Sequence, residues 1–131
     1  MDEIISKMKK RLDEPNDDDS FFTAIRNIFR YVLIFSEKVG NSEQNPVKEQ
    51  FETDGTIDKL VQIFEFDKLK NKKVYQLIAA SLAGIYKASQ LPSKFGQQIT
   101  TFLKLQSNPD IEQIFIHSIL AISWLAECQG I

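Results

Sequence analysis

His117 and Cys128 are the only histidine and the only cysteine in this chain of 131 residues, so they are the first candidates for nucleophilic or metal chemistry. The two residues are eleven positions apart on one expected helix, which separates them by about 16 Å along its axis. A reactive cysteine–histidine pair needs an approach of about 3 Å, and this spacing therefore excludes one. We expect His117 to be a half-buried packing residue and Cys128 a buried apolar side chain.

The sequence also lacks the other patterns that carry catalysis or metal binding. It contains no zinc-ligand set, no Gly-x-x-x-x-Gly-Lys phosphate loop and no Gly-x-Ser-x-Gly turn. Carboxylates are present, but no pair of them is marked out for acid–base chemistry. Asp17, Asp18 and Asp19 are suited to capping a helix, because adjacent carboxylates at a helix start do not surround an ion. We therefore expect no enzyme activity, no metal and no cofactor.

Composition excludes further classes of protein. Sixteen Lys and Arg against eighteen Asp and Glu give a net charge of -2, which argues against a globally basic nucleic-acid binder. The longest apolar runs, 31–35 and 119–122, are far shorter than the roughly 20 residues of a membrane span. A lone cysteine forms no intrachain disulfide, and the N-terminal residues do not resemble a signal peptide. We expect a cytoplasmic protein, with the nucleus as the alternative.

The elements that position these side chains are helices, because apolar residues recur at helical spacing and no stretch alternates as a strand would. Pro15, Gly40, Gly55, Pro92 and Pro109 mark breaks between them. We expect helices at about 2–12, 20–39, 46–52, 56–64, 74–89, 97–105 and 110–127. The chain is predicted to be all-α.

The two medium helices begin near Gly55 and Gly96, which are 41 residues apart, and a period near 40 is typical of helical solenoids. The segment 55–64, Gly-Thr-Ile-Asp-Lys-Leu-Val-Gln-Ile-Phe, resembles the second helix of an armadillo repeat, and 74–86 and 118–126 resemble the third. The resemblance covers about residues 20–131. It implies a short right-handed armadillo/HEAT-like superhelix of about seven to eight helices. Residues 1–14 would form an N-terminal capping helix, and 17–131 the repeats (17–69, 70–107 and a partial 108–131). Other helical superhelices stay open as alternatives.

In armadillo-like arrays the third helices line a concave groove that binds extended peptides or other proteins. The positions at which importin-alpha-like members carry their asparagine ladder fall here on Gly84 and Trp124, so recognition of nuclear-localisation signals is not expected. The candidate groove residues interrupt the apolar stripes of the third helices: Arg26, Asn27, Arg30, Gln76, Ala80, Gly84, Gln113, His117 and Trp124. The alternative is that these candidate residues simply lie on the solvated side of a helix.

The last expected helix is apolar on almost every side, although a solenoid normally ends in a polar cap. We expect the surface around Ile116, Leu120 and Trp124 to be an interface with a second copy or with further repeats. The alternative is that the N-terminal helix or the enlarged connection 37–45 covers this surface.

Lys68, Lys70, Lys72 and Lys73 form a small basic patch at a hinge between repeats. The simplest interpretation is a solvated hinge, and the alternative is contact with an acidic partner or a phosphate. The sequence as a whole predicts a non-catalytic protein–protein interaction module that uses its helical groove or its apolar C-terminal face. The alternative function is binding of nucleic acid or acidic phospholipid through the basic patch.

Overall fold

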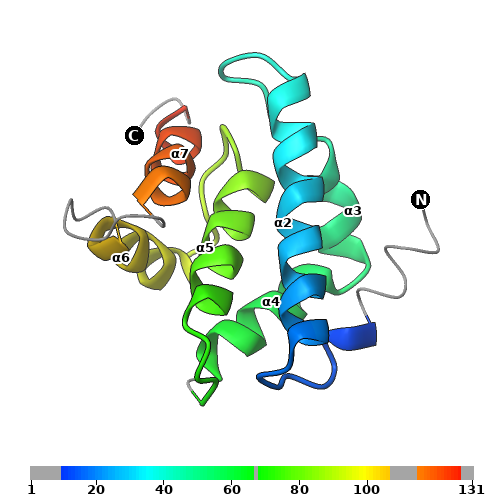
Figure 1. Cartoon of the computed structure of the whole chain (residues 1–131). Helices are drawn as coiled ribbons and strands as arrows, with labels where there is room; N and C mark the ends of the chain where they lie inside the picture. Colours follow the sequence, from blue (N-terminus) through cyan, green and yellow to red (C-terminus); the bar gives the residue numbers. More distant parts are fainter. Residues whose placement is uncertain (1–9, 67, 107–114, 128–131) are drawn as a thin grey trace.

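A computed structural model of the chain describes residues 10–66, 68–106 and 115–127. These residues form six helices and no strand, which confirms the all-α prediction (Figure 1). The N-terminal capping helix lies almost entirely outside the described residues, and a superhelix of seven to eight helices is not confirmed. The helices are α2 (Asp19–Lys38), α3 (Val47–Thr53), α4 (Thr56–Glu65), α5 (Lys73–Ile85), α6 (Gly96–Gln106) and α7 (Phe115–Ala126).

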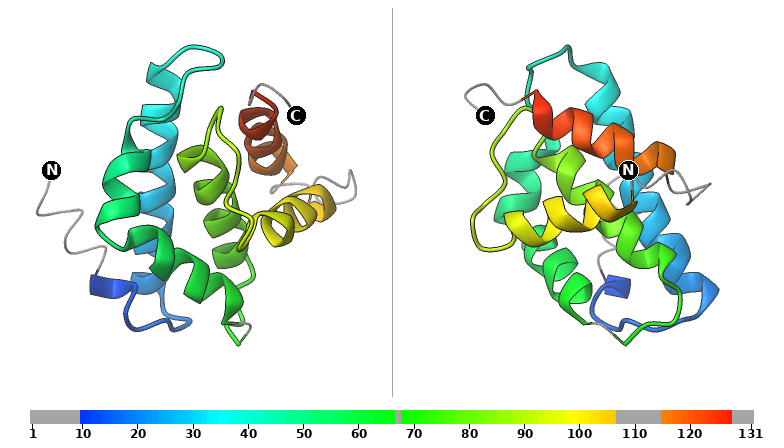
Figure 2. Two further views of the ribbon diagram at one scale, coloured as in Figure 1. Left: turned by 180° about the vertical axis from the view of Figure 1, so that it is seen from behind. Right: turned by 90° about the vertical axis from the view of Figure 1, so that its left-hand side faces the viewer.

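Helix α5 is the centre of the fold. It packs against α2 on one side and against α7 and α6 on the other, and α4 contacts it as well (Figures 1 and 2). Ten of its thirteen residues are buried, since it has neighbours on nearly every side. Small residues at Ala79, Ala80, Ala83 and Gly84 leave space for these neighbours to approach its backbone.

The aspartate cluster caps α2, as the sequence predicts. The Asp18 carboxylate accepts a hydrogen bond from the backbone N–H of Phe21 at 2.7 Å, and it satisfies one of the free donors at the helix start. Asp17 has a different role, because its Oδ1 accepts from the N–H groups of Lys70 and Asn71 at 2.7 and 2.9 Å. The turn between α4 and α5 is thereby fixed to the start of α2.

The end of one predicted helix differs from the structure. Helix α5 ends at Ile85 and not near residue 89, because Ala88 has a positive φ of 58° and donates its N–H to the carbonyl of Trp124. Helix α4 begins at Thr56, where the sequence predicts it. The capping position is Gly55, whose φ of +85° suits glycine.

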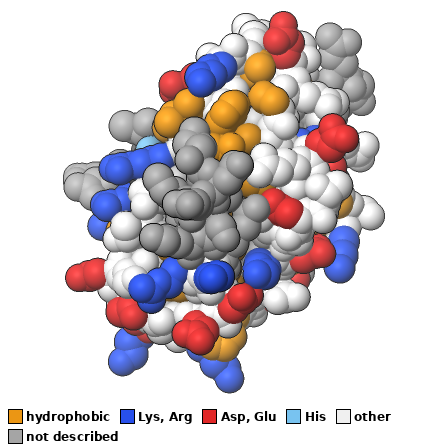
Figure 3. All heavy atoms as spheres, turned by 90° about the vertical axis from the view of Figure 1, so that its right-hand side faces the viewer, with side chains coloured by type: hydrophobic (Ala, Val, Ile, Leu, Met, Phe, Trp, Pro, Cys, Tyr) orange, Lys and Arg blue, Asp and Glu red, His pale blue; other side chains and the backbone are white. Residues whose placement is uncertain are grey.

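Some apolar side chains remain at the surface of α2. Figure 3 shows them gathered in the upper part of the face that it presents, over the C-terminal half of this helix. Ile34 is 50% exposed there, and Tyr31 and Phe35 are half-buried beside it. Tyr31 is also stacked on Phe51 of α3, which accounts for part of its apolar surface.

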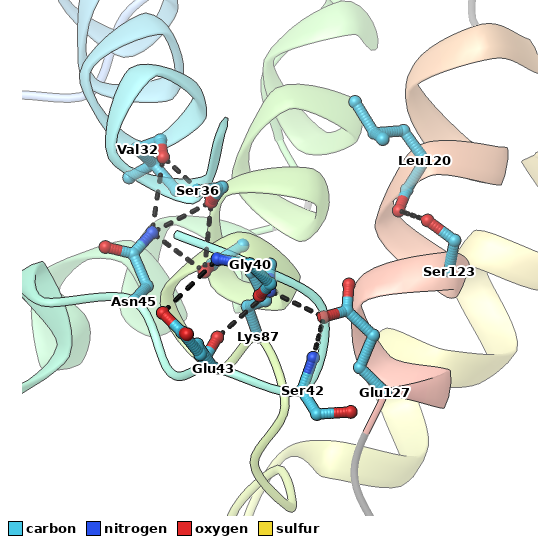
Figure 4. Close-up of polar contacts among 11 residues, drawn as sticks. Val32, Ser36, Gly40, Ser42, Glu43, Asn45, Lys87, Leu120, Ser123 and Glu127 are labelled. Atoms are coloured by element: carbon cyan, nitrogen blue, oxygen red, sulfur yellow. Dashed lines mark hydrogen bonds and ion pairs between the residues drawn. The ribbon is translucent and has the colours of Figure 1, made fainter. Parts of the chain in front are cut away.

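A buried lysine holds the long connection between α2 and α3 (Figure 4). The Nζ of Lys87 donates to the carbonyls of Gly40 and Glu43 at 2.8 and 2.9 Å, and it forms an ion pair with Glu127. Glu127 in turn accepts from the N–H of Ser42 at 2.8 Å. We call Lys87, Glu127 and the loop atoms that they bind the lysine clamp. It joins the enlarged connection to the ends of α5 and α7.

A second buried polar side chain lies beside the lysine clamp. Asn45 donates its amide to the carbonyls of Val32 and Gly84 and to the hydroxyl of Ser36, at 3.2, 3.0 and 2.8 Å. Its Oδ1 accepts from the N–H of Val47 at 3.0 Å. Because every polar atom of this buried amide has a partner, Asn45 fixes the start of α3 against α2 and α5.

Candidate functional site

A cleft of about 330 Å³ lies between α2, the first turns of α5 and the start of α7. Its volume is within the range of roughly 300–1,000 Å³ that is usual for ligand sites. Basic side chains stand at its walls and apolar ones form much of its lining. We call it the basic cleft. It is lined by Phe22, Arg26, Phe29, Arg30, Leu33, Lys73, Gln76, Leu77 and His117.

Helix α2 supplies most of the lining because of its residue spacing. Positions 22, 26, 29, 30 and 33 follow one another at intervals of one to four residues, which places them along one side of an α-helix. Phe29 is buried against the core, while Phe22 and Leu33 are half-buried. The same side of α2 thus combines an apolar base with Arg26 and Arg30.

The basic cleft has an uncompensated positive charge within the described part of the chain. Arg26, Arg30 and Lys73 line it, no carboxylate does, and none of the three forms an ion pair with a described residue. The guanidinium of Arg26 lies 5.7 Å from the ring centroid of Phe22. Its Nε is buried and has no hydrogen-bond partner among the described residues. Such an arrangement favours an anionic ligand group.

His117 is exposed, so the expectation of a half-buried residue is wrong in degree. Its ring meets Phe29 edge-on, with 5.0 Å between centroids and an interplanar angle of 76°. Packing on one edge of the ring leaves the rest of the imidazole open to solvent. His117 brings a polar group from α7 to the rim of the basic cleft.

Some of the predicted groove residues line the basic cleft and others do not. Arg26, Arg30, Gln76 and His117 line the basic cleft together, although they come from three helices. Asn27 is half-buried and is not part of the lining. Gln113 lies outside the described residues.

Three other groove candidates are wrong as surface residues, because Ala80, Gly84 and Trp124 are buried in the core. A Cβ atom on Gly84 would lie 2.6 Å from Cγ1 of Val32 and 3.0 Å from Cζ3 of Trp124. Glycine at this position allows α2 and α7 to approach α5 from opposite sides. These residues therefore serve the packing of the helices, and they do not form a surface for binding.

Of the three residues of the predicted apolar interface, Trp124 is corrected in the same way, and the interface itself stays a prediction. Trp124 is 4% exposed and is covered by elements of its own chain. Leu120 is half-buried, and the side chain of Ile116 is outside the described residues. Large exposed apolar side chains on this part of the fold are instead Ile119 of α7 and Leu105 of α6.

The four lysines of the basic patch are all exposed around the turn between α4 and α5. Lys68 lies 6.0 Å from the ring of Phe66, and Lys72 lies 5.2 Å from that of Tyr75. Lys73 also lines the basic cleft, which the sequence did not indicate. The carboxylate of Asp17 lies against the same turn, where it accepts from the N–H groups of Lys70 and Asn71.

The sequence analysis missed the apolar lining of the basic cleft, namely Phe22, Phe29, Leu33 and Leu77. None of them was singled out as a site residue, since apolar residues on a helix usually belong to the core. For Phe22, Phe29 and Leu33 the available signal was their position on the same side of α2 as Arg26 and Arg30.

Two other hollows do not have a predominantly positive lining. One of about 560 Å³ between α4, α5 and α6 has both Glu65 and Lys72 in its lining. Another, of about 510 Å³, is lined largely by uncharged polar residues near the start of α6, with Lys104 at one side. Neither combines several cations with an aromatic base, so the basic cleft is the better candidate.

Among the described residues no group of three His, Cys, Asp or Glu side chains could hold a metal ion. Burial and a hydrogen bond to Glu52 raise the pKa of Tyr86, so its phenol stays protonated and donates at 3.1 Å. This shift is opposite to that of an activated nucleophile. No helix in the described part of the chain has the length and apolar character needed to cross a membrane.

The sequence matches no family model, and no curated protein or solved structure is similar enough to count as a match. The resemblance to armadillo repeats therefore stays a prediction from sequence pattern.

Proposed function

We propose that this protein is a non-catalytic protein-interaction module that binds a peptide segment of its partner in the basic cleft. The observation that carries the proposal is the combination of Arg26, Arg30 and Lys73 without carboxylate partners over an aromatic and aliphatic base. Arginine beside aromatic surface is typical of residues that dominate protein interfaces. The fold would then be a short armadillo-like array whose long helices present the cleft.

The arrangement of the long helices supports this proposal. Helices α2, α5 and α7 follow one another across the molecule, with α5 in the middle (Figure 1). The basic cleft lies between these three helices, and a groove between helices is one of the recurring sites of peptide recognition. Arg26 and Arg30, which the sequence assigns to the first repeat, line the cleft together with Gln76, which it assigns to the second.

Selection from a random-peptide display library, with the full chain as target, tests this function. Enriched peptides should bind the wild-type chain and lose at least about tenfold in affinity for the double variant R26Q/R30Q, because charged contacts contribute about 1.5–3 kcal/mol each. The matched variant K94Q/K104Q removes the same charge from exposed sites outside the cleft and should bind normally. The proposal is wrong if no peptide is enriched, or if the enriched peptides do not distinguish the two variants.

Binding of nucleic acid or acidic phospholipid through Lys68, Lys70, Lys72 and Lys73 is the second candidate function. The exposure of all four lysines favours it. The carboxylate of Asp17 bonds within the same turn and reduces the local attraction for phosphates. We therefore rank it below peptide binding. Binding of oligo-uridine or phosphatidylserine vesicles that falls steeply with salt, and is lost in K68Q/K70Q/K72Q, would reverse this order.

A further inference from the structure

The length of the basic cleft limits how much of a partner it can hold. Its lining on α2 runs from Phe22 to Leu33, which are eleven positions or about 16 Å apart along the helix. An extended chain advances by about 3.3 Å per residue, so the cleft accommodates about five residues. Its volume of about 330 Å³ suits the side chains of one extended segment and is small for a helix about 10 Å across.

The spacing of the two arginines carries information about the ligand. Arg26 and Arg30 are one helical turn apart, which corresponds to about 6 Å along α2. Side chains on the same side of an extended chain belong to alternate residues, about 6.6 Å apart. Carboxylates on alternate ligand residues would therefore meet the two guanidinium groups in register.

The opposite wall determines what lies between the two carboxylates. A residue between them points away from α2 and toward α5, where Leu77 is half-buried in the cleft lining. An aliphatic side chain at this ligand position would bury apolar surface against Leu77. Lys73, in the first turn of α5, adds positive charge on the same wall.

We propose that the basic cleft recognises an extended acidic segment of the form carboxylate–aliphatic–carboxylate, with the two carboxylates on Arg26 and Arg30 and the aliphatic side chain facing Leu77. This inference rests on the proposed function, since it names the chemistry of the peptide that the cleft binds. The partner is an acidic stretch of another protein that is extended when bound.

Fluorescence anisotropy with the full chain and short labelled peptides of matched composition tests the proposal. The probe contains Glu-Leu-Glu, and the comparison peptides contain Glu-Glu-Leu, glutamates four residues apart, or Gln-Leu-Gln. We expect the probe to bind at least about tenfold more tightly than each comparison peptide, because each loses one or both charged contacts. The variant R26Q/R30Q should reduce binding of the probe to the level of Gln-Leu-Gln, and K94Q/K104Q should leave it unchanged.

A charge exchange separates recognition from any effect on folding. The variant R26E/R30E should lose the Glu-Leu-Glu peptide and gain binding of a matched Lys-Leu-Lys peptide, a result that a merely structural role of the arginines would not produce. Thermal unfolding of each variant verifies that it is folded. Failure of the exchange in a folded R26E/R30E protein contradicts the assignment of the two carboxylate contacts.

The remaining outcomes distinguish this inference from the proposed function. Equal affinity for Glu-Leu-Glu and Glu-Glu-Leu, with both lost in R26Q/R30Q, overturns the alternate spacing and leaves the cleft as a peptide site. Tighter binding of the peptide with glutamates four residues apart replaces the extended ligand by a helical one. If no acidic peptide binds but display-selected neutral peptides occupy the cleft, the ligand chemistry is wrong and the function stands. If no peptide binds at the cleft at all, both are wrong.

Discussion

The lysine clamp and the basic cleft use cations in opposite ways. The Lys87 side chain is 4% exposed, and its three N–H groups are directed to two carbonyls and to Glu127. Arg26, Arg30 and Lys73 stand at a cleft with no carboxylate partner among the described residues. A buried charge is tolerated only when it is paired and hydrogen-bonded, whereas a charge at the surface can stay unpaired at little cost. The difference indicates that Lys87 maintains the fold, and it is the basis for our proposal that the cleft cations bind a ligand.

The largest effect should come from Lys87→Met, which keeps much of the side-chain volume and removes the charge. Glu127 would lose its ion-pair partner, and the carbonyls of Gly40 and Glu43 would lose a donor. We expect the free energy of unfolding to fall by about 3 kcal/mol, at the lower end for a broken buried pair because Glu127 is partly exposed. Chemical denaturation measures this change, and Lys94→Met is the exposed control, with less than about 0.5 kcal/mol expected. Equal effects of the two substitutions would show that the lysine clamp is not a stabilising element.

A smaller loss of stability should follow from Asn45→Ala, which removes the amide beside the lysine clamp. The substitution deletes the donors to Val32, Ser36 and Gly84 and leaves buried polar atoms with fewer partners. We expect a decrease of about 2 kcal/mol in the free energy of unfolding. The exposed Asn41→Ala is the control in the same loop. A change as small as that of the control would mean that the Asn45 hydrogen bonds add no net stability.

The smallest effect on stability should come from R26Q/R30Q, even though it removes two charges. Neither arginine forms an ion pair with a described residue, and the main loss is the contact of Arg26 with the ring of Phe22. We expect the free energy of unfolding to change by less than about 1 kcal/mol, while peptide binding falls as described above. If R26Q/R30Q destabilises the chain as much as Lys87→Met does, the cleft arginines belong to the framework and the contrast with the lysine clamp disappears.

The positions of the helices could be predicted from the sequence because their signals are local. The Asp18 cap, the glycine before α4 and the apolar periodicity of α2 act over a few residues, and each predicted the correct element. The end of α5 was predicted too late. What stops this helix is a hydrogen bond from Ala88 to Trp124, a partner 36 positions further along the chain that no local pattern reveals.

The candidate site was predicted in part. Arg26 and Arg30 were identified because they interrupt an apolar stripe on one helix, a property that spacing determines. Ala80, Gly84 and Trp124 interrupt or follow similar stripes and were assigned to the same groove. They are buried because helices on two sides of α5 approach at these residues, and the approach depends on residues far apart in the sequence.

The sequence by itself determined an all-helical chain, the approximate helix limits and the cations on one side of α2. These properties follow from helical periodicity and capping, which act between residues a few positions apart. The tertiary structure alone decided that Lys87 is buried and that Lys73, Gln76 and His117 join the arginines of α2 at one cleft. The physical reason is that burial and charge pairing depend on which helix faces meet, and this is fixed by packing across the whole chain.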